Sequence, residues 1–263
     1  MKTELIVRST HGKAEGTVQL PQVFETPYRP DVIRRAYINL LSHKFQEQGR
    51  YPAAGEMVSA ESRNTGLGIA RLARIRGQGF SRAGQAAGVA GVRAGRAAHP
   101  PESWKDIYKK INKKERQLAL SSAIAATSHK DIIVSRGHRV EGISDFPIIA
   151  SDSIESINKS RDLVQALLAF GLAEDLSRSG SSKAKGTKSG SRSGTSALVV
   201  VRRGSNVCRL ANSIPGIDVK DAESLSVLDL APGGKPIRLT VFSKGSLEYL
   251  EKYGRKDHYL VMQ

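Results

Sequence analysis

Apolar residues follow two different periods along the chain, and the change between them outlines the fold. Leu5–Val7 and Thr17–Leu20 are short apolar runs on either side of a turn-rich stretch, which predicts a β-hairpin. From residue 32 to residue 45 apolar positions recur at helical spacing. This pattern predicts a helix with Asp31 as its N-cap and an end near Gly49.

A second helix is predicted after Asn112, which forms a capping-box pattern with Glu115. Beyond it, short apolar runs alternate with helices, starting at Ile132–Val134 and Pro147–Ala150, and the uninterrupted run Ala197–Val201 is typical of a strand covered on both faces. This alternation predicts an α/β fold, a single three-layer domain with a mostly parallel sheet. Further helix and strand candidates lie at 163–170, 207–211, 217–219, 224–230, 239–242 and 246–253.

Between the two predicted helices the periodic pattern is lost. Residues 62–101 hold seven arginines, eight glycines and nine alanines, but no lysine, aspartate or glutamate. So few large apolar side chains cannot offset the entropy of ordering, so we expect this segment to be disordered in isolation. Arginine's planar guanidinium suits bidentate phosphate contacts and stacking on bases, and a long insertion of this kind is usually functional. The expected partner is structured RNA.

The net charge of +16 is concentrated in two segments. Residues 62–101 carry +7, residues 177–196 carry +5 without any acid, and the remaining 203 residues carry only +4. A nearly neutral body with two cationic extensions is typical of a protein that binds a polyanion. A membrane surface is a weaker fit, because the first segment lacks the apolar face of a membrane-binding helix. No run of eighteen apolar residues and no secretory signal is present, so we expect a cytoplasmic protein.

These patterns predict a globular domain formed by residues 1–49 and 102–263, an extended RNA-penetrating loop at 50–101, and a second basic loop at 177–196. Trp104 beside Lys105 has two interpretations: a hydrophobic anchor with a solvated lysine face, or an RNA-facing patch in which the indole stacks. The candidate RNA-binding residues are Arg63, Arg71, Arg74, Arg76, Arg82, Arg93, Arg96, Trp104, Lys105, Lys183, Lys185, Lys188 and Arg192.

No motif in the sequence indicates catalysis or a cofactor. Gly66-Leu67-Gly68 and Gly77-Gln78-Gly79 begin a dinucleotide fingerprint, but neither follows a predicted strand, and arginine stands where the third glycine belongs. The histidines are scattered, without the spacing of a zinc site. We therefore expect no enzyme, no cofactor, no metal and no small-molecule substrate.

Four segments resemble the universal large-subunit ribosomal protein L-four family, in its archaeal and eukaryotic branch. They are Leu20–Pro27, Arg96–Pro101, Asn112–Ala119 and Asp229–Gly234, in the family's order around the basic loop. The second basic tract departs from the family pattern, because eight serines dilute its charge.

The resemblance implies a structural constituent of the large ribosomal subunit that binds 23S-type ribosomal RNA and contacts other large-subunit proteins. It also implies that the extended loop aids assembly and lines the peptide exit tunnel, beside the nascent polypeptide. The family's arginine-rich tip corresponds to residues 66–82. The tunnel-lining candidates are Arg71, Leu72, Arg74, Arg76 and Gly77.

Two other classes of function remain open from the residues alone. One is an RNA-modifying enzyme whose α/β domain holds a nucleotide or methyl donor, which would need a glycine-rich turn directly after a core strand. The other is a nucleic-acid-binding regulator, although neither a helix-turn-helix nor an RNA-recognition aromatic motif is evident.

Overall fold

The computed structural model describes residues 4–181, 194–210, 213–235 and 237–251 and divides into two compact units. Unit 1 comprises Met1–Ser42 with Lys109–Gln263, and unit 2 comprises His43–Tyr108. Within the described ranges, no helix is long and apolar enough to cross a membrane.

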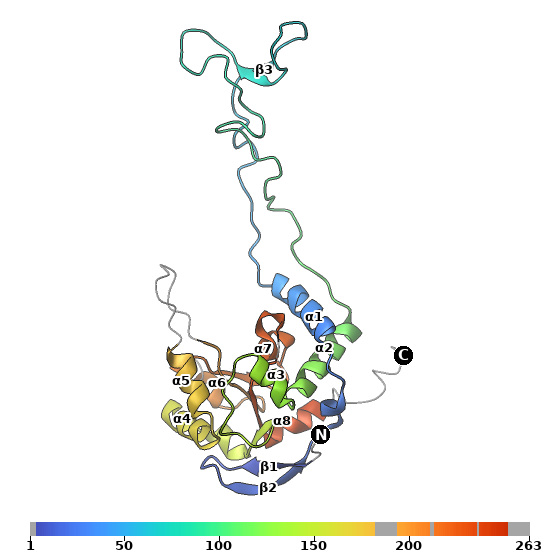
Figure 1. Ribbon diagram of the computed structural model, residues 1–263, viewed down its shortest axis with the longest axis vertical. Coiled ribbons are helices and arrows are strands. Elements are labelled where there is room, and N and C mark those ends of the chain that lie inside the picture. Colours follow the sequence, from blue (N-terminus) through green and yellow to red (C-terminus); the bar gives the residue numbers. More distant parts are fainter. Residues whose placement is uncertain (1–3, 182–193, 211–212, 236, 252–263) are drawn as a thin grey trace. The chain divides into compact units, whose positions relative to one another are not determined.

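Unit 1 is built on a six-stranded sheet with the strand order β2-β1-β5-β8-β6-β7. Its first two strands, β1 and β2, lie side by side in Figure 1. β1 pairs antiparallel with β2, and the other neighbours in the sheet pair in parallel. The predicted α/β class with a mostly parallel sheet is therefore confirmed, as is the opening hairpin. The strands are β1 (Glu4–Arg8), β2 (Ala14–Gln19), β5 (Ile148–Ala150), β6 (Leu198–Val201), β7 (Asp218–Asp221) and β8 (Thr240–Ser243).

Alternate residues of the central strands point into two separate cores. Leu198 and Val200 belong to a core with α1, α2, α7 and α8, whereas Val199 and Val201 belong to a core with α3, α4 and α6. Because β6 is covered on both faces, its continuous apolar run is satisfied, and unit 1 has three layers. The helices are α1 (Pro30–Ser42), α2 (Lys113–Ala126), α3 (Lys130–Ser135), α4 (Ser160–Ala169), α5 (Ala173–Ser181), α6 (Val207–Leu210), α7 (Val227–Leu230) and α8 (Lys244–Leu250).

The predicted first helix exists, but both of its ends differ from the prediction. α1 begins at Pro30, so Asp31 lies in the first turn, where its carboxylate accepts hydrogen bonds from the Arg29 guanidinium at 2.8 and 3.1 Å. These bonds lower the pKa of Asp31 to about 2. The helix ends at Ser42 and not near Gly49, because the residues that follow, Phe45 included, are exposed and give it no face to bury.

The second predicted helix is also present, without its predicted cap. Asn112 stands at the N-cap of α2, but its side chain makes no capping hydrogen bond among the described residues. The Glu115 carboxylate instead accepts a hydrogen bond at 3.0 Å from Arg35 on α1. A capping-box pair is found at α7, where the Asp229 carboxylate accepts from the backbone N–H and the hydroxyl of Ser226.

The sequence pattern predicted that the apolar run Ile132–Val134 is one of the short runs between helices. In the structure it lies within helix α3. Only Ile133 of the three is buried, and Val134 is 48% exposed. A three-residue apolar run carries no period, so burial of a single side chain is compatible with a helical turn as well as with a strand.

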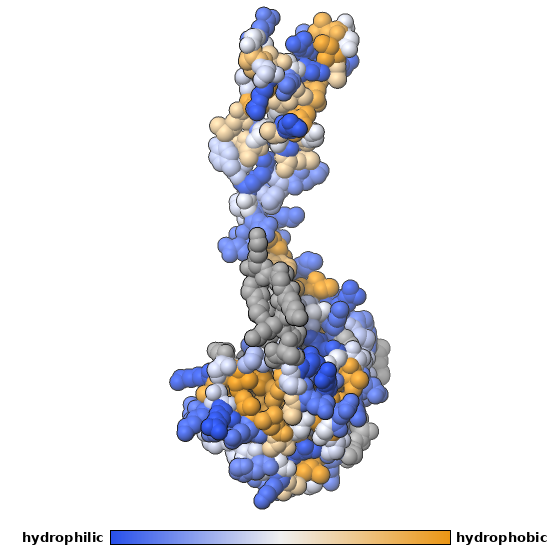
Figure 2. All heavy atoms as spheres, turned by 60° about the vertical axis from the view of Figure 1, so that its left-hand side comes forward, coloured by the Kyte–Doolittle hydropathy of each residue, from blue (hydrophilic) through white to orange (hydrophobic). Residues whose placement is uncertain are grey.

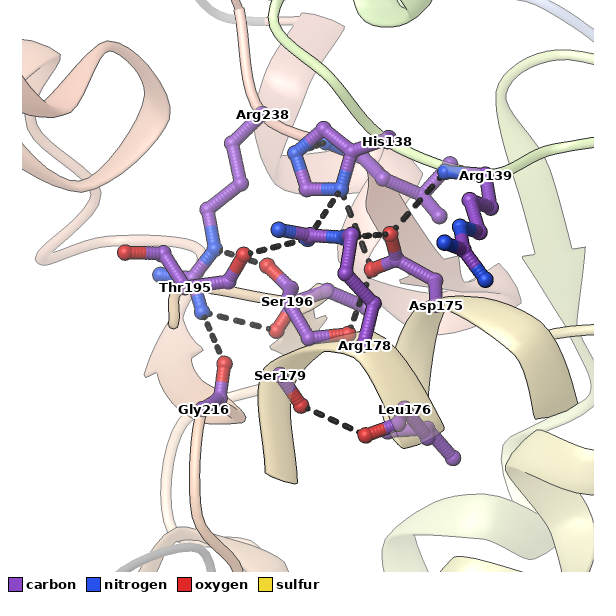
Figure 3. A network of polar contacts seen from close by, with 12 residues as sticks. His138, Arg139, Asp175, Leu176, Arg178, Ser179, Thr195, Ser196, Gly216 and Arg238 are labelled. Carbon is purple, nitrogen blue, oxygen red and sulfur yellow. Dashed lines mark hydrogen bonds and ion pairs between the residues drawn. The ribbon is translucent and has the colours of Figure 1, made fainter. Parts of the chain in front are cut away.

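The starts of three parallel strands are joined by the buried side chain of Arg238, which is 1% exposed. Its guanidinium donates to the carbonyl oxygens of Ser196, Ala197 and Gly216, and it forms an ion pair with Asp218 (Figure 3). Ser196 and Ala197 precede β6, Gly216 precedes β7, and Arg238 itself precedes β8. One cation before β8 therefore donates to carbonyl groups at the amino ends of two further strands, β6 and β7.

Candidate nucleic-acid interface

Unit 2 contains a small sheet at the centre of its arginine-rich segment. β3 (Ala60–Ser62) pairs antiparallel with β4 (Ala73–Ile75), and Ala86 bridges to Arg74 on the other side of β4. The segment that we expected to be disordered in isolation therefore has backbone order of its own in the structure. This order rests on backbone hydrogen bonds, since Ala87 is the only buried residue within 62–101.

The structure separates Arg74 from the other arginines of this segment. Arg74 is half-buried, its Nη1 donates to the carbonyl oxygen of Gly84 at 2.9 Å, and its Nε is buried without a partner among the described residues. A guanidinium held this way serves the conformation of the loop. It is less free than its neighbours to reach an external phosphate.

Two further arginines are paired with acids that lie just outside the acid-free segment. Arg76 forms an ion pair with Glu61, and Arg96 lies 3.6 Å from the Glu56 carboxylate. Both pairs are solvent-exposed, so each contributes little to stability and is readily exchanged for another anion. Counting charges within the segment alone missed these pairs.

The remaining arginines of the segment, Arg63, Arg71, Arg82 and Arg93, are exposed. Among the tunnel-lining candidates, Leu72 is 38% exposed, and Gly77 is exposed with a φ of 111° that favours glycine. On the visible face of unit 2, hydrophilic and hydrophobic residues are interspersed (Figure 2). Mixed guanidinium and small apolar groups suit a surface that contacts both phosphates and bases.

Aromatic side chains are exposed near the two ends of unit 2. Trp104 is 72% exposed, which does not fit a buried anchor, and the neighbouring Lys105 is exposed as well. The rings of His43 and Tyr108 stack in parallel with their centroids 3.6 Å apart. Exposed aromatic faces beside cations are the groups on which unpaired bases stack.

The second basic tract is only partly described. The candidate residues Lys183, Lys185, Lys188 and Arg192 lie outside the described residues. Both flanks of the tract are described, at the end of α5 and before β6.

The carboxyl ends of the parallel strands, where nucleotides bind in many α/β enzymes, are occupied by carboxylates. Glu155 accepts from the Ser243 hydroxyl at 2.5 Å and from the Arg202 N–H at 2.9 Å. Asp152 accepts from the Gly245 N–H at 2.7 Å, in the first turn of α8. These carboxylates use the donors that a phosphate would need and repel its charge, so the edge is unsuited to a nucleotide.

Three of the four segments that carry the family resemblance lie in unit 1, and Arg96–Pro101 lies in unit 2. Phe24 is 2% exposed and packs edge-on against Phe242, with ring centroids 5.8 Å apart. The Ser122 hydroxyl on α2 donates to the Pro27 carbonyl oxygen at 2.9 Å. A Cβ on Gly234, whose φ is 65°, would lie 3.2 Å from the Tyr37 ring on α1. These signatures therefore report the fold of the globular unit.

Comparison with known proteins agrees with this picture. The sequence matches the ribosomal protein L4/L1 family over residues 18–253. The large ribosomal subunit protein uL4 of Methanopyrus kandleri is 38% identical over 255 residues, covering 95% of this chain and 98% of the relative. The proteins of the same name from Thermoplasma acidophilum and Methanococcus vannielii are each 36% identical, covering 96% and 94% of this chain and 99% and 98% of the relatives. The chain belongs to the ribosomal protein L4/L1 family.

Proposed function

We propose that this chain is a structural constituent of the large ribosomal subunit in the cytoplasm, that it binds 23S-type ribosomal RNA, and that unit 2 aids subunit assembly and lines the peptide exit tunnel. The proposed partners are the ribosomal RNA, neighbouring large-subunit proteins and the nascent polypeptide. The chain is not an enzyme, since its relatives are structural ribosomal proteins.

One observation carries the RNA-binding part of the proposal. Four arginines of unit 2 are exposed within an acid-free segment, and two more are paired only with exposed acids. Exposed guanidinium groups on a backbone of small residues allow close approach to phosphates, and their charge is independent of cellular pH. Binding would replace the weak internal ion pairs by phosphate contacts.

The first experiment tests membership of the large subunit. Cell extract is sedimented through a high-salt sucrose gradient, and the chain is quantified in each fraction by mass spectrometry. We expect near-stoichiometric migration with the large subunit, resistant to salt, because a segment embedded in RNA is not released by screening alone. A salt-labile or free distribution would contradict the proposal and favour the enzyme or regulator.

A second experiment tests the exit tunnel. A photo-crosslinking amino acid is placed at Leu72, and the matched control carries it at Leu168 on α4 of unit 1, which is similarly exposed at 45%. In ribosomes stalled with a radiolabelled nascent chain, we expect crosslinks to that chain from position 72 and none from position 168. Crosslinks from position 72 to RNA alone would leave RNA binding in place and overturn the tunnel role.

A further inference from the structure

The Asp175 carboxylate, on α5, is completely buried and accepts four hydrogen bonds (Figure 3). Its Oδ2 lies 3.0 Å from His138 Nδ1 and 2.6 Å from the Ser196 hydroxyl. Its Oδ1 accepts from the Arg139 N–H at 3.1 Å and from Arg178 Nε at 2.9 Å. A buried carboxylate with this many donors is held in its ionised form.

The hydrogen bonds of His138 define its tautomer. The Leu239 N–H donates to His138 Nε2 at 3.4 Å, so Nδ1 carries the proton and donates to Asp175. Arg178, whose Nε donates to the same carboxylate, balances its charge. Burial raises the pKa of Asp175, but the hydrogen bonds from His138, Arg178 and Ser196 more than offset this and hold the pKa below its ordinary value.

These contacts join the two ends of the second basic tract, which flank its residues 182–193; those residues lie outside the described part of the chain. On one flank are Arg178 and Ser179 of α5, and on the other are Gly194, Thr195 and Ser196. The Gly194 N–H donates to the Ser179 carbonyl oxygen at 3.2 Å, and Arg178 Nη2 donates to the Thr195 carbonyl oxygen at 2.8 Å. Together with the bond from the Ser196 hydroxyl to Asp175, these bonds hold the chain before residue 180 against the chain after residue 193. We call this set of contacts the neck.

Gly216, which precedes β7, packs against both sides of this neck. Its φ is +83°, and a Cβ there would lie 2.5 Å from the Gly194 carbonyl oxygen and 2.9 Å from the Ser179 side chain. Its own carbonyl oxygen accepts from the Ser196 N–H at 2.7 Å. Only glycine fits between these groups in this conformation.

We propose that Asp175 is a positioning residue that holds the end of α5 against the chain before β6, so that the two described flanks of the second basic tract are already together when the tract contacts ribosomal RNA. This inference rests on the proposed function and on the prediction from the sequence that the second basic tract contacts the RNA. A closed neck removes the entropic cost of bringing the flanks together at the moment of binding.

Arg178 shows how the neck changes the charge count of the tract. It is one of the five cations in residues 177–196, yet its Nε and Nη2 both donate to groups of this chain, and its side chain is only 26% exposed. Its charge is therefore used internally. The cations left for RNA are the lysines and Arg192.

The neck is tested first in the free full-length chain. Asp175→Asn removes the carboxylate charge, and Gly216→Ala forces the neck apart by sterics while leaving Asp175 intact. The matched control is Glu155→Gln, which removes a carboxylate that likewise accepts from a hydroxyl and a backbone N–H, at the opposite end of the sheet.

The readout is hydrogen exchange at the amides of Gly194 and Ser196, measured relative to the β6 amides. In both neck variants we expect exchange there to be faster by roughly tenfold or more, since a charge-assisted bond or its geometry is lost. In the control we expect the change at Arg202 instead. Unchanged exchange at Gly194 in Asp175→Asn would overturn the role of Asp175 in the neck.

The second test measures binding of the same variants to an archaeal 23S-type ribosomal RNA transcript across a salt series. We expect affinity to fall by about tenfold in both neck variants with the salt slope unchanged, because no phosphate-binding cation is removed. Unchanged affinity despite an open neck would overturn the positioning role. Failure of the wild-type chain to bind the transcript would instead overturn the proposed function, and the exchange result would still decide whether Asp175 holds the neck.

Discussion

Arginine has opposite roles in the two units. In unit 1, Arg238 is 1% exposed and all of its contacts are to strand-end carbonyl groups and one carboxylate of the same chain. In unit 2, Arg71 and Arg82 are exposed and form no ion pair among the described residues. The same type of side chain therefore satisfies buried groups of unit 1, whereas in unit 2 it leaves guanidinium groups exposed and available to an external anion. The neighbouring backbone decides the role, since Arg238 lies among converging strand ends and Arg71 lies among glycines and alanines.

The largest expected effect comes from removing the internal arginine. Arg238→Met removes the guanidinium that donates to three carbonyl oxygens and pairs with Asp218. The carbonyl oxygens of Ala197 and Gly216 keep a backbone donor, so we expect a loss of about 3 kcal/mol in the free energy of unfolding. Arg238→Lys should recover little of it, because one ammonium cannot match a planar guanidinium. Urea denaturation followed by far-ultraviolet circular dichroism measures both. A loss below about 1 kcal/mol for Arg238→Met would erase the contrast between the units.

Acid provides the next largest effect, through the buried Asp175 carboxylate of unit 1. Because the pKa of Asp175 is depressed in the folded chain, its contribution to stability is present above the unfolded pKa of about 4 and is lost as pH falls below that value. We expect a loss on the order of 2 kcal/mol between pH 5 and pH 2 from this group. Urea titrations at several pH values test this, and the profile of Asp175→Asn should be flatter. An equally steep profile in that variant would assign the acid sensitivity to other carboxylates.

Arginines of unit 2 should change RNA binding and leave the unfolding of unit 1 unchanged. Replacing Arg71, Arg74 and Arg76 by alanine should shift the stability of unit 1 by less than about 0.5 kcal/mol, while subunit assembly is impaired. Each phosphate contact that is lost should reduce the salt slope of RNA binding by about 0.7 to 0.9. A comparable loss of stability in the free chain would contradict this division of roles.

Within that triple variant, the structure sharpens the comparison between Arg71 and Arg74. Arg71→Ala should reduce the salt slope, since its guanidinium is exposed. Arg74→Ala should leave the slope nearly unchanged and instead increase hydrogen exchange at β4, because its guanidinium donates to the Gly84 carbonyl oxygen. The same slope change in both single variants would show that Arg74 leaves its internal partner to bind RNA.

The smallest effect is expected from an exposed acid. Glu61→Gln frees Arg76 from its ion pair, so affinity for the ribosomal RNA transcript should rise by less than about threefold, with almost no change in stability. Filter binding at low salt measures this. A decrease in affinity would mean that Glu61 holds the hairpin in its binding conformation.

Much of unit 1 was predictable because its apolar pattern is long and regular. The run at Ala197–Val201 and the helical spacing around Val32 and Ile33 gave the α/β class, since burial on one or two faces leaves a clear period. The run Ile132–Val134 was too short to carry a period, and its placement between helices was wrong. The end of α1 was also misplaced, because Phe45 fits a helical pattern although it is 56% exposed.

The buried polar groups were not predictable from the sequence. His138 and Asp175 are 37 residues apart, and Arg238 follows His138 by 100 residues, so no local spacing connects them. Their proximity arises only when the amino ends of β6, β7 and β8 come together. In unit 2 the composition indicated RNA binding, but only the structure distinguished Arg74 from Arg71, because that difference depends on the pairing of β3 with β4.

The sheet order has a consequence for the time course of synthesis. β1 pairs with β5, Val7 with Ile149, and β5 pairs with β8, Ile149 with Phe242, so the central strands are separated by long stretches of chain. At about 5 to 20 residues per second, translation from Arg8 to Ser243 takes roughly 10 to 50 s. We expect the arginine-rich segment to emerge, open to cellular RNA, well before the sheet that anchors it can close, and protease resistance of unit 1 in stalled chains should appear only once β8 has emerged.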